Sequence, residues 1–228
     1  MSSTFITQEV SIVIAAQQSP AMLREDLLKY SGIIPTDWQL SRQPVSGEQL
    51  SQLAFENGCS IASQPDRLMF LEAINDKAPE DVVIGDVARR YVEIMKAGSY
   101  QAVGINFRSY IPYPTDDDAA DQYICSKLLA PGDWQTYGKE NVRAALNLLY
   151  TLERGQLNLS INSASVQQPD QQSLPILLFS GNFNYDIKEV PAEKRIPTMA
   201  AFIDNWITDY DTFRELISQK FVALLGEN

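Results

Sequence analysis

The chain has 228 residues, of which 45% are hydrophobic and 21% are charged, and this ordinary globular composition excludes a largely disordered protein. Its net charge is −11, and its largest basic groups are the pairs Arg89–Arg90 and Lys194–Arg195. Direct binding of nucleic acid or of an anionic membrane requires a basic cluster, so we expect neither.

Histidine is absent from the whole sequence. Its absence excludes Ser-His-Asp and Cys-His nucleophiles and every metal site that uses imidazole. Chemistry based on carboxylates, lysine, tyrosine or Mg²⁺ stays open. We therefore expect no resident cofactor and favour a protein that is not an enzyme.

The two cysteines, Cys59 and Cys125, are far apart and form no CxxC motif. Without a neighbouring histidine they are predicted to be structural thiols of a reducing compartment. The N-terminus lacks the pattern of a signal peptide, and no apolar run approaches the ~20 residues of a membrane helix. These features predict a cytoplasmic protein with no membrane association.

The first half of the chain predicts a strand over residues 4–16 and a helix over 20–30, which Pro20 begins and Gly32 follows. Four short strands are then predicted at residues 38–45, 49–56, 59–63 and 67–74. Asn57–Gly58 is the turn of a hairpin among them. A helix over 79–97 and a strand over 100–111 complete this half.

The second half predicts a helix over residues 118–130 and strands over 142–152, 156–166 and 176–187. The first two of these strands join around Arg154–Gly155. A long C-terminal helix follows Pro197. We expect it to break at residues 209–211, because Thr212 and Glu215 match a capping box.

These elements predict the α+β fold class, with mainly antiparallel sheet and helices packed on one face, because hairpin-like connections dominate. The order of strands and helices is loosely doubled along the chain. We therefore expect a single α+β domain over 1–228, and the alternative is a subdivision into two similar halves, 1–111 and 112–228.

Short polar residues alternate with apolar residues in the later strands, although asparagine is depleted in strands. If these strands are neighbours, one sheet face carries many amides, which both donate and accept hydrogen bonds. Such a face suits a neutral polar ligand, and the alternative is an ordinary solvent-facing side. The predicted ligand-binding residues are Asn106, Arg108, Tyr110, Asn158, Ser160, Asn182 and Asn184.

The densest acidic run supplies a candidate site for a hard cation such as Mg²⁺ or Ca²⁺, with Asp116, Asp118 and Asp121 as ligands. The run does not match an EF-hand, because the twelfth residue from Asp116 is Lys127 rather than glutamate. The alternative is that the acids lie at the N-terminus of a helix, where the helix dipole favours them.

An apolar stripe runs along the C-terminal helix at helical spacing. A continuous helix here would be about 40 Å long, which is more than a small core covers, so we expect part of it to contact a second copy in a homodimer. The alternative is packing on the sheet of the same chain. The stripe consists of Met199, Phe202, Ile203, Trp206, Tyr210, Phe213, Ile217, Phe221 and Leu224.

The sequence thus favours a non-catalytic interaction or scaffold protein that binds a protein partner or itself. Three alternatives stay open. The amide-bearing face could bind a small polar ligand, the acids at 116–121 could serve a Mg²⁺-dependent enzyme, and the acidic surface could imitate a phosphate backbone.

Overall fold

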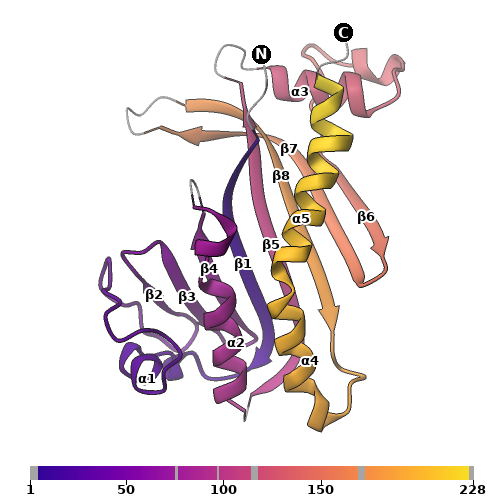
Figure 1. Ribbon diagram of the computed structural model, residues 1–228. Helices are drawn as coiled ribbons and strands as arrows, with labels where there is room; N and C mark the ends of the chain where they lie inside the picture. The colour runs from indigo at the N-terminus through magenta and orange to yellow at the C-terminus, as the bar shows by residue number, and fades with distance from the viewer. Residues whose placement is uncertain (1–4, 75–76, 97, 114–117, 169–172, 226–228) are drawn as a thin grey trace.

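A computed structural model describes residues 5–74, 77–96, 98–113, 118–168 and 173–225 (Figure 1). Within this part of the chain, eight strands form one antiparallel sheet, which confirms the predicted α+β class and the mainly antiparallel pairing. Across the sheet the strands lie in the order β2 (Ser51–Ala54), β3 (Cys59–Gln64), β4 (Arg67–Ala73), β1 (Ile6–Gln17), β5 (Ser99–Pro112), β8 (Ser173–Asp186), β7 (Gly155–Gln167) and β6 (Leu146–Leu152).

The longer helices lie in front of the central strands in Figure 1. The helix α2 contacts β1 and β4, and α4 and α5 contact β5. The described α-helices are α1 (Glu25–Tyr30), α2 (Ile84–Ile94), α3 (Ala119–Tyr123), α4 (Ala192–Asp204) and α5 (Trp206–Leu216). Short 3₁₀ or π segments adjoin several of them, and none of the described helices is long and apolar enough to cross a membrane.

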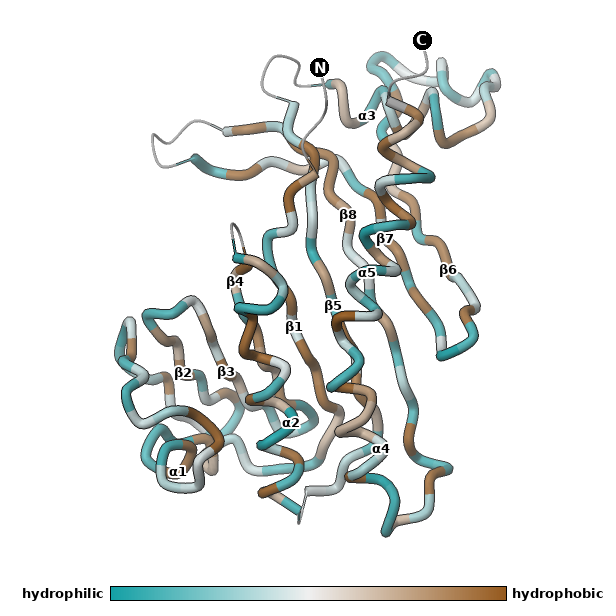
Figure 2. The backbone as a smooth tube through the Cα atoms, viewed as in Figure 1, coloured by the Kyte–Doolittle hydropathy of each residue, from teal (hydrophilic) through white to brown (hydrophobic). Residues whose placement is uncertain are grey.

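Much of the core lies where α2, α4 and α5 contact the central strands of the sheet. Successive side chains of a strand point to opposite faces, so every second residue can join this core. One such row is Phe70, Ile12, Ile105 and Phe183, which are register partners across β4, β1, β5 and β8 and are all buried. Hydrophobic colours accordingly run along β1 and β4 in Figure 2.

The C-terminal apolar stripe packs against the sheet of its own chain. Met199, Ile203, Phe213 and Ile217 are completely buried, and the ring of Phe213 stacks on that of Phe107 in β5 with centroids 5.5 Å apart. Intramolecular packing therefore accounts for the stripe. A dimer through this helix stays a prediction.

The break in this helix was predicted wrongly at residues 209–211. The structure places it at Asn205, between α4 and α5, and Trp206 follows directly. Trp206 lies so close to α2 that a Cβ atom on Gly85 would be 2.7 Å from its indole. Thr212 lies inside α5, where its hydroxyl donates to the carbonyl of Thr208, so the predicted capping box does not begin a helix.

The helix α2 begins at Ile84, later than predicted, because a side chain from the sheet caps it. Glu72 of β4 is completely buried, and its Oε2 atom accepts the N–H groups of Val83 at 2.8 Å and Ile84 at 2.9 Å. Its Oε1 atom accepts from Lys77 Nζ at 2.7 Å. The carboxylate thus satisfies amides that a helix start leaves without partners.

The predicted strand over residues 38–45 is reduced to two isolated bridges, Leu40–Phe55 and Val45–Gln52. Pro44 lacks the N–H group that a continuous ladder requires, and residues 41–50 are all exposed. The segment nevertheless lies along β2 at the edge of the sheet.

Candidate functional site

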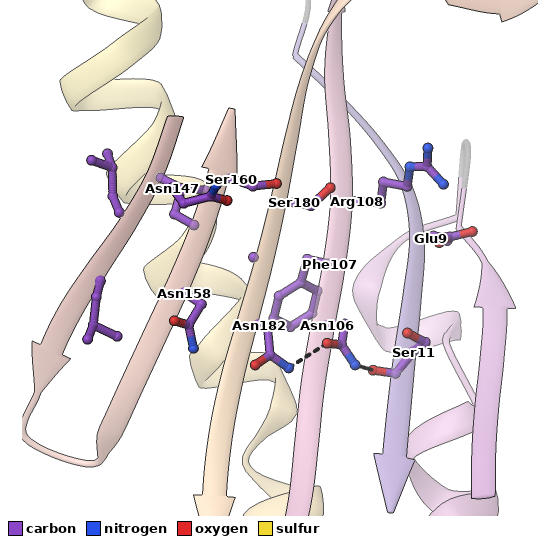
Figure 3. A pocket seen from close by; sticks show the side chains of 14 residues that line it. Glu9, Ser11, Asn106, Phe107, Arg108, Asn147, Asn158, Ser160, Ser180 and Asn182 are labelled. Atoms are coloured by element: carbon purple, nitrogen blue, oxygen red, sulfur yellow. Dashed lines mark hydrogen bonds between the residues drawn. The ribbon is translucent and has the colours of Figure 1, made fainter. Parts of the chain in front are cut away.

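The sheet face opposite the buried row of Phe70, Ile12, Ile105 and Phe183 carries the predicted polar residues. Ser11, Asn106, Asn182 and Asn158 are register partners in one row across β1, β5, β8 and β7. The adjacent row contains Glu9, Arg108, Ser180, Ser160 and Asn147. Figure 3 shows these two rows side by side. Five of the seven predicted ligand-binding residues therefore come together on the three neighbouring strands β5, β8 and β7.

The remaining two predicted residues lie in neighbouring rows of the same face. Asn184 is the partner of Gly104 and of Gln156, and Tyr110 is the partner of Leu178. Asn184 lines a smaller adjoining concavity of about 330 Å³, whereas Tyr110 lines neither this one nor the larger one. Asn184 thus extends the candidate site, and Tyr110 stands apart from it.

The two central rows form the floor of an open concavity of about 630 Å³. Four lining residues with polar side chains, Glu9, Ser11, Asn147 and Ser180, were not in the predicted set. Asn147 and Ser180 share the alternation of their strands, so the sequence held a signal for them. Glu9 and Ser11 reach the site because β1 pairs with β5, and no local pattern encodes that pairing.

A chain of amides crosses the centre of this concavity. Asn182 Nδ2 donates to Asn106 Oδ1 at 2.6 Å, and Asn106 Nδ2 donates to the carbonyl oxygen of Ser11 at 3.2 Å (Figure 3). A Cβ atom on Gly104 would lie 2.9 Å from Asn182 Nδ2, so the glycine leaves room for this pair. The two amides are therefore held in one orientation.

Further hydrogen-bonding groups are available beside these linked amides. Within the described part of the protein, the side-chain amide of Asn158 and the Oδ1 atom of Asn182 have no hydrogen-bond partner. Asn158 is exposed, and it offers both a donor and an acceptor. A ligand lying on the row would thus meet oriented amide groups.

One side of the concavity is charged. Glu9 and Arg108 are cross-strand neighbours on β1 and β5, and both line the concavity. Arg108 is exposed and forms no ion pair with any residue that the structure describes. The concavity therefore combines neutral amides with one guanidinium and one carboxylate at its margin.

The candidate cation ligands lie elsewhere, at the start of α3. Asp116 is outside the described residues. Asp121 accepts a hydrogen bond from Ser163 of β7 at 2.6 Å, and its Oδ2 atom lies 3.5 Å from Arg143 Nε. Among the described residues, no group of three or more potential ligands is placed to hold a metal ion, and the cation site stays a prediction.

Two buried polar clusters on the helix side are structural in character. Asp209 of α5 accepts from the Tyr185 hydroxyl at 2.8 Å and from Arg154 Nη2 at 3.0 Å, which ties α5 to β8 and to the β6–β7 turn. Burial raises the pKa of the Asp209 carboxyl to about 6. Near Glu72, burial and the Glu72 charge raise the pKa of the Cys59 thiol, so this cysteine does not ionise at neutral pH.

No protein-family model matches the chain, and no curated protein sequence matches it either. Functional inference therefore depends on the chemistry of the open face. This face presents hydrogen-bond donors and acceptors from amides and hydroxyls, and these amides and hydroxyls neither gain nor lose protons near neutral pH.

Proposed function

We propose that the protein is a non-catalytic binding protein and that its open sheet face binds a small, neutral polar ligand. The observation that carries this proposal is the row of Ser11, Asn106, Asn182 and Asn158, which crosses four strands at the floor of the 630 Å³ concavity. Small-molecule sites are typically concave and contain a few polar groups that fix the ligand's orientation.

The amide chain supports this proposal because its orientation is set before a ligand arrives. The 2.6 Å bond between Asn182 and Asn106 spares a ligand part of the cost of ordering these side chains. Asn158 adds an amide that is not used by the protein, and Arg108 adds a cation at the margin. A ligand with amide, hydroxyl or carbonyl groups matches this set.

The test is a binding screen with defined probes, followed by NMR of the ¹⁵N-labelled protein. The probes are free amino acids, dipeptides, monosaccharides and nucleosides. We expect at least one class to shift the side-chain amide signals of Asn106, Asn158 and Asn182. Asn158→Ala should then weaken binding by roughly three- to tenfold, the value of one hydrogen bond.

Gln156→Ala is the matched control, because Gln156 is an exposed carboxamide on the same strand and face but does not line the concavity. It should leave the affinity unchanged. Failure of every probe to bind, or equal weakening by both variants, would contradict the proposal.

We also propose that two parts of the chain share one arrangement, with the division before β5 at about residue 98 rather than at the predicted boundary between 1–111 and 112–228. In each part a strand and a short helix precede three strands and a longer helix. From the centre of the sheet outward, the order is β1, β4, β3 and β2 on one side and β5, β8, β7 and β6 on the other. In this arrangement the helices cover the same face in both halves.

Superposition in an experimentally determined structure tests this similarity. A rotation of about 180° should bring β1 to β4 and α2 onto β5 to β8 and α4. Strands that align only in part, or helices that fall on opposite faces, would contradict the proposal.

A further inference from the structure

The two edge strands of the sheet differ in whether another segment of the chain covers them. The edge strand β2 is covered by the segment before it: the Ser41 N–H group donates to the carbonyl of Ala54 at 2.9 Å, and Val45 and Gln52 exchange two backbone hydrogen bonds of 3.0 and 2.8 Å. This cover blocks pairing with another strand at that edge.

The opposite edge strand, β6, has no such cover. In the part of the chain that the structure describes, its ladder partner is β7, and no other backbone hydrogen bond involves its seven residues. In an antiparallel pair, every second residue points its N–H and C=O groups away from its neighbour, so β6 presents a row of free backbone groups.

The side chains of β6 do not protect this edge. Its sequence, LNLLYTL, contains no charged residue and no proline, and these are the residues that usually prevent edge strands from pairing. Leu149 at its centre is 60% exposed. Figure 2 shows β6 mostly in hydrophobic or neutral colours.

We propose that β6 pairs antiparallel with β6 of a second copy of this chain, which joins the two sheets into one across a two-fold axis. A two-fold interface must be self-complementary. An antiparallel strand without charges meets this requirement, whereas most other contacts between two chains of net charge −11 bring acidic surfaces together.

Charged residues at the two ends of β6 favour pairing with a second copy of this chain, and they favour one register of that pairing. Two charged residues flank β6: Arg143 lies in the segment before it, and Glu153 lies in the turn between β6 and β7. When Leu148 lies opposite Leu148 of the second copy, Arg143 and Glu153 lie equally far along the chain from the two-fold axis, so each end of the interface brings one arginine near the glutamate of the other copy.

Both side chains are available for these pairs. The Arg143 side chain is 76% exposed, and its one ion pair among the described residues is the 3.5 Å contact with Asp121. Glu153 is exposed and forms no ion pair within the described part. Opposite charges directly across a strand pair are stabilising, and like charges there are destabilising.

In this register the dimer extends the open concavity. Asn147 and Leu149 both line it. In this register Asn147 lies opposite Leu149 of the second copy, and Leu149 lies opposite Asn147 of that copy. The two amide-lined floors then meet at the dimer axis. The dimer itself does not depend on the proposed ligand binding.

The test is analytical ultracentrifugation of the full chain across a dilution series from millimolar to micromolar. We expect a dimer that dissociates on dilution. Glu153→Arg and Arg143→Glu each place like charges together at both ends of the interface, so each should raise the dissociation constant by about tenfold or more. The double variant R143E/E153R should restore a value close to that of the unmodified protein.

Leu149→Lys adds a charge at the centre of the edge and should abolish the dimer. Ile207→Lys is the matched control, because Ile207 is 43% exposed on α5, away from this edge, and its replacement should leave the dimer unchanged. Circular dichroism confirms that each variant is folded. A monomer at all concentrations, a dimer that survives L149K, or a double variant no better than the single ones would overturn the proposal.

Discussion

The ring of Phe213 fills the space directly beside Gly181. A Cβ atom on Gly181 would lie 2.6 Å from the Cδ2 atom of this ring, which is closer than carbon atoms pack. Phe213 is completely buried and also stacks on Phe107 of β5. A missing side chain in β8 thus sets how closely α5 approaches the sheet.

We expect Gly181→Ala to lower the free energy of unfolding by about 1–3 kcal/mol, because the added methyl group overpacks a full core. Urea denaturation measures the effect. In the double variant G181A/F213L the smaller leucine side chain leaves room for the added methyl group. The combined loss of stability should therefore be less than the sum of the two single losses. Strictly additive losses would show that Gly181 and Phe213 do not interact in this way.

Replacement of the buried carboxylate of Glu72 should lower the stability of the fold more than replacement of an exposed charged group. Glu72→Gln removes the charge that holds Lys77 and that faces the N-terminus of α2, and we expect a loss of about 2 kcal/mol in urea denaturation. Glu93→Gln is the control, because Glu93 forms an exposed ion pair with Arg89 within α2 and should cost below about 0.5 kcal/mol. Equal costs would show that Glu72 does not act as a cap.

Local patterns in the sequence were sufficient to identify the open face. Alternation is a property of each strand alone, so Asn106, Asn158 and Asn182 could be assigned to one side before any pairing was known. The turn between β6 and β7, which the structure places at Glu153 and Arg154, was also predicted to within one residue from local residue types. The antiparallel class followed from short connections of this kind.

Long-range contacts explain what the sequence did not reveal. The start of α2 depends on Glu72 from a different element, and the break at Asn205 comes just before Trp206, which packs on Gly85. The Ser11 carbonyl joins the candidate site only because β1 lies beside β5. Each of these depends on which elements become neighbours, and no short segment of the sequence encodes that choice.

The two thiols should differ in reactivity in the native state. Cys59 is buried, and burial together with the Glu72 charge raises its pKa, so almost no thiolate forms. Cys125 is only half-buried and donates a weak hydrogen bond to the carbonyl of Val142. We expect Ellman's reagent to modify Cys125 first in the folded protein and Cys59 only after unfolding.

The variant Cys125→Ser provides the control for this experiment. It should remove the reaction seen under native conditions and leave one thiol that reacts in denaturant. A fast native reaction that persists in this variant would mean that Cys59 is accessible, contrary to its burial.

The cluster of Asp209, Tyr185 and Arg154 should make stability depend on pH. Burial raises the pKa of Asp209 from 3.8 to about 6, although the Tyr185 hydroxyl and Arg154 both favour the charged form. The folded state therefore binds this proton more tightly than the unfolded state. The penalty for the buried charge is full above about pH 6 and is relieved as the pH falls towards about 4.

The size of this penalty is up to about 3 kcal/mol, because Asp209 is only 3% exposed and solvent screens it little. Asp209→Asn carries no charge at any pH. We expect it to be more stable than the unmodified protein at about pH 8, with the advantage shrinking as the pH falls to about 5. Urea denaturation of both proteins across this range measures the difference.

The other carboxylates also make stability depend on pH. Their contribution is the same in D209N and in the unmodified protein, so it cancels in the difference between the two. Asp211→Asn is a further control, since Asp211 is exposed two residues along the same helix. It should not reproduce the pH-dependent gain expected of D209N. A difference between D209N and the unmodified protein that stays constant with pH would mean that Asp209 does not titrate near 6, and that Arg154 and Tyr185 hold its charge at little cost.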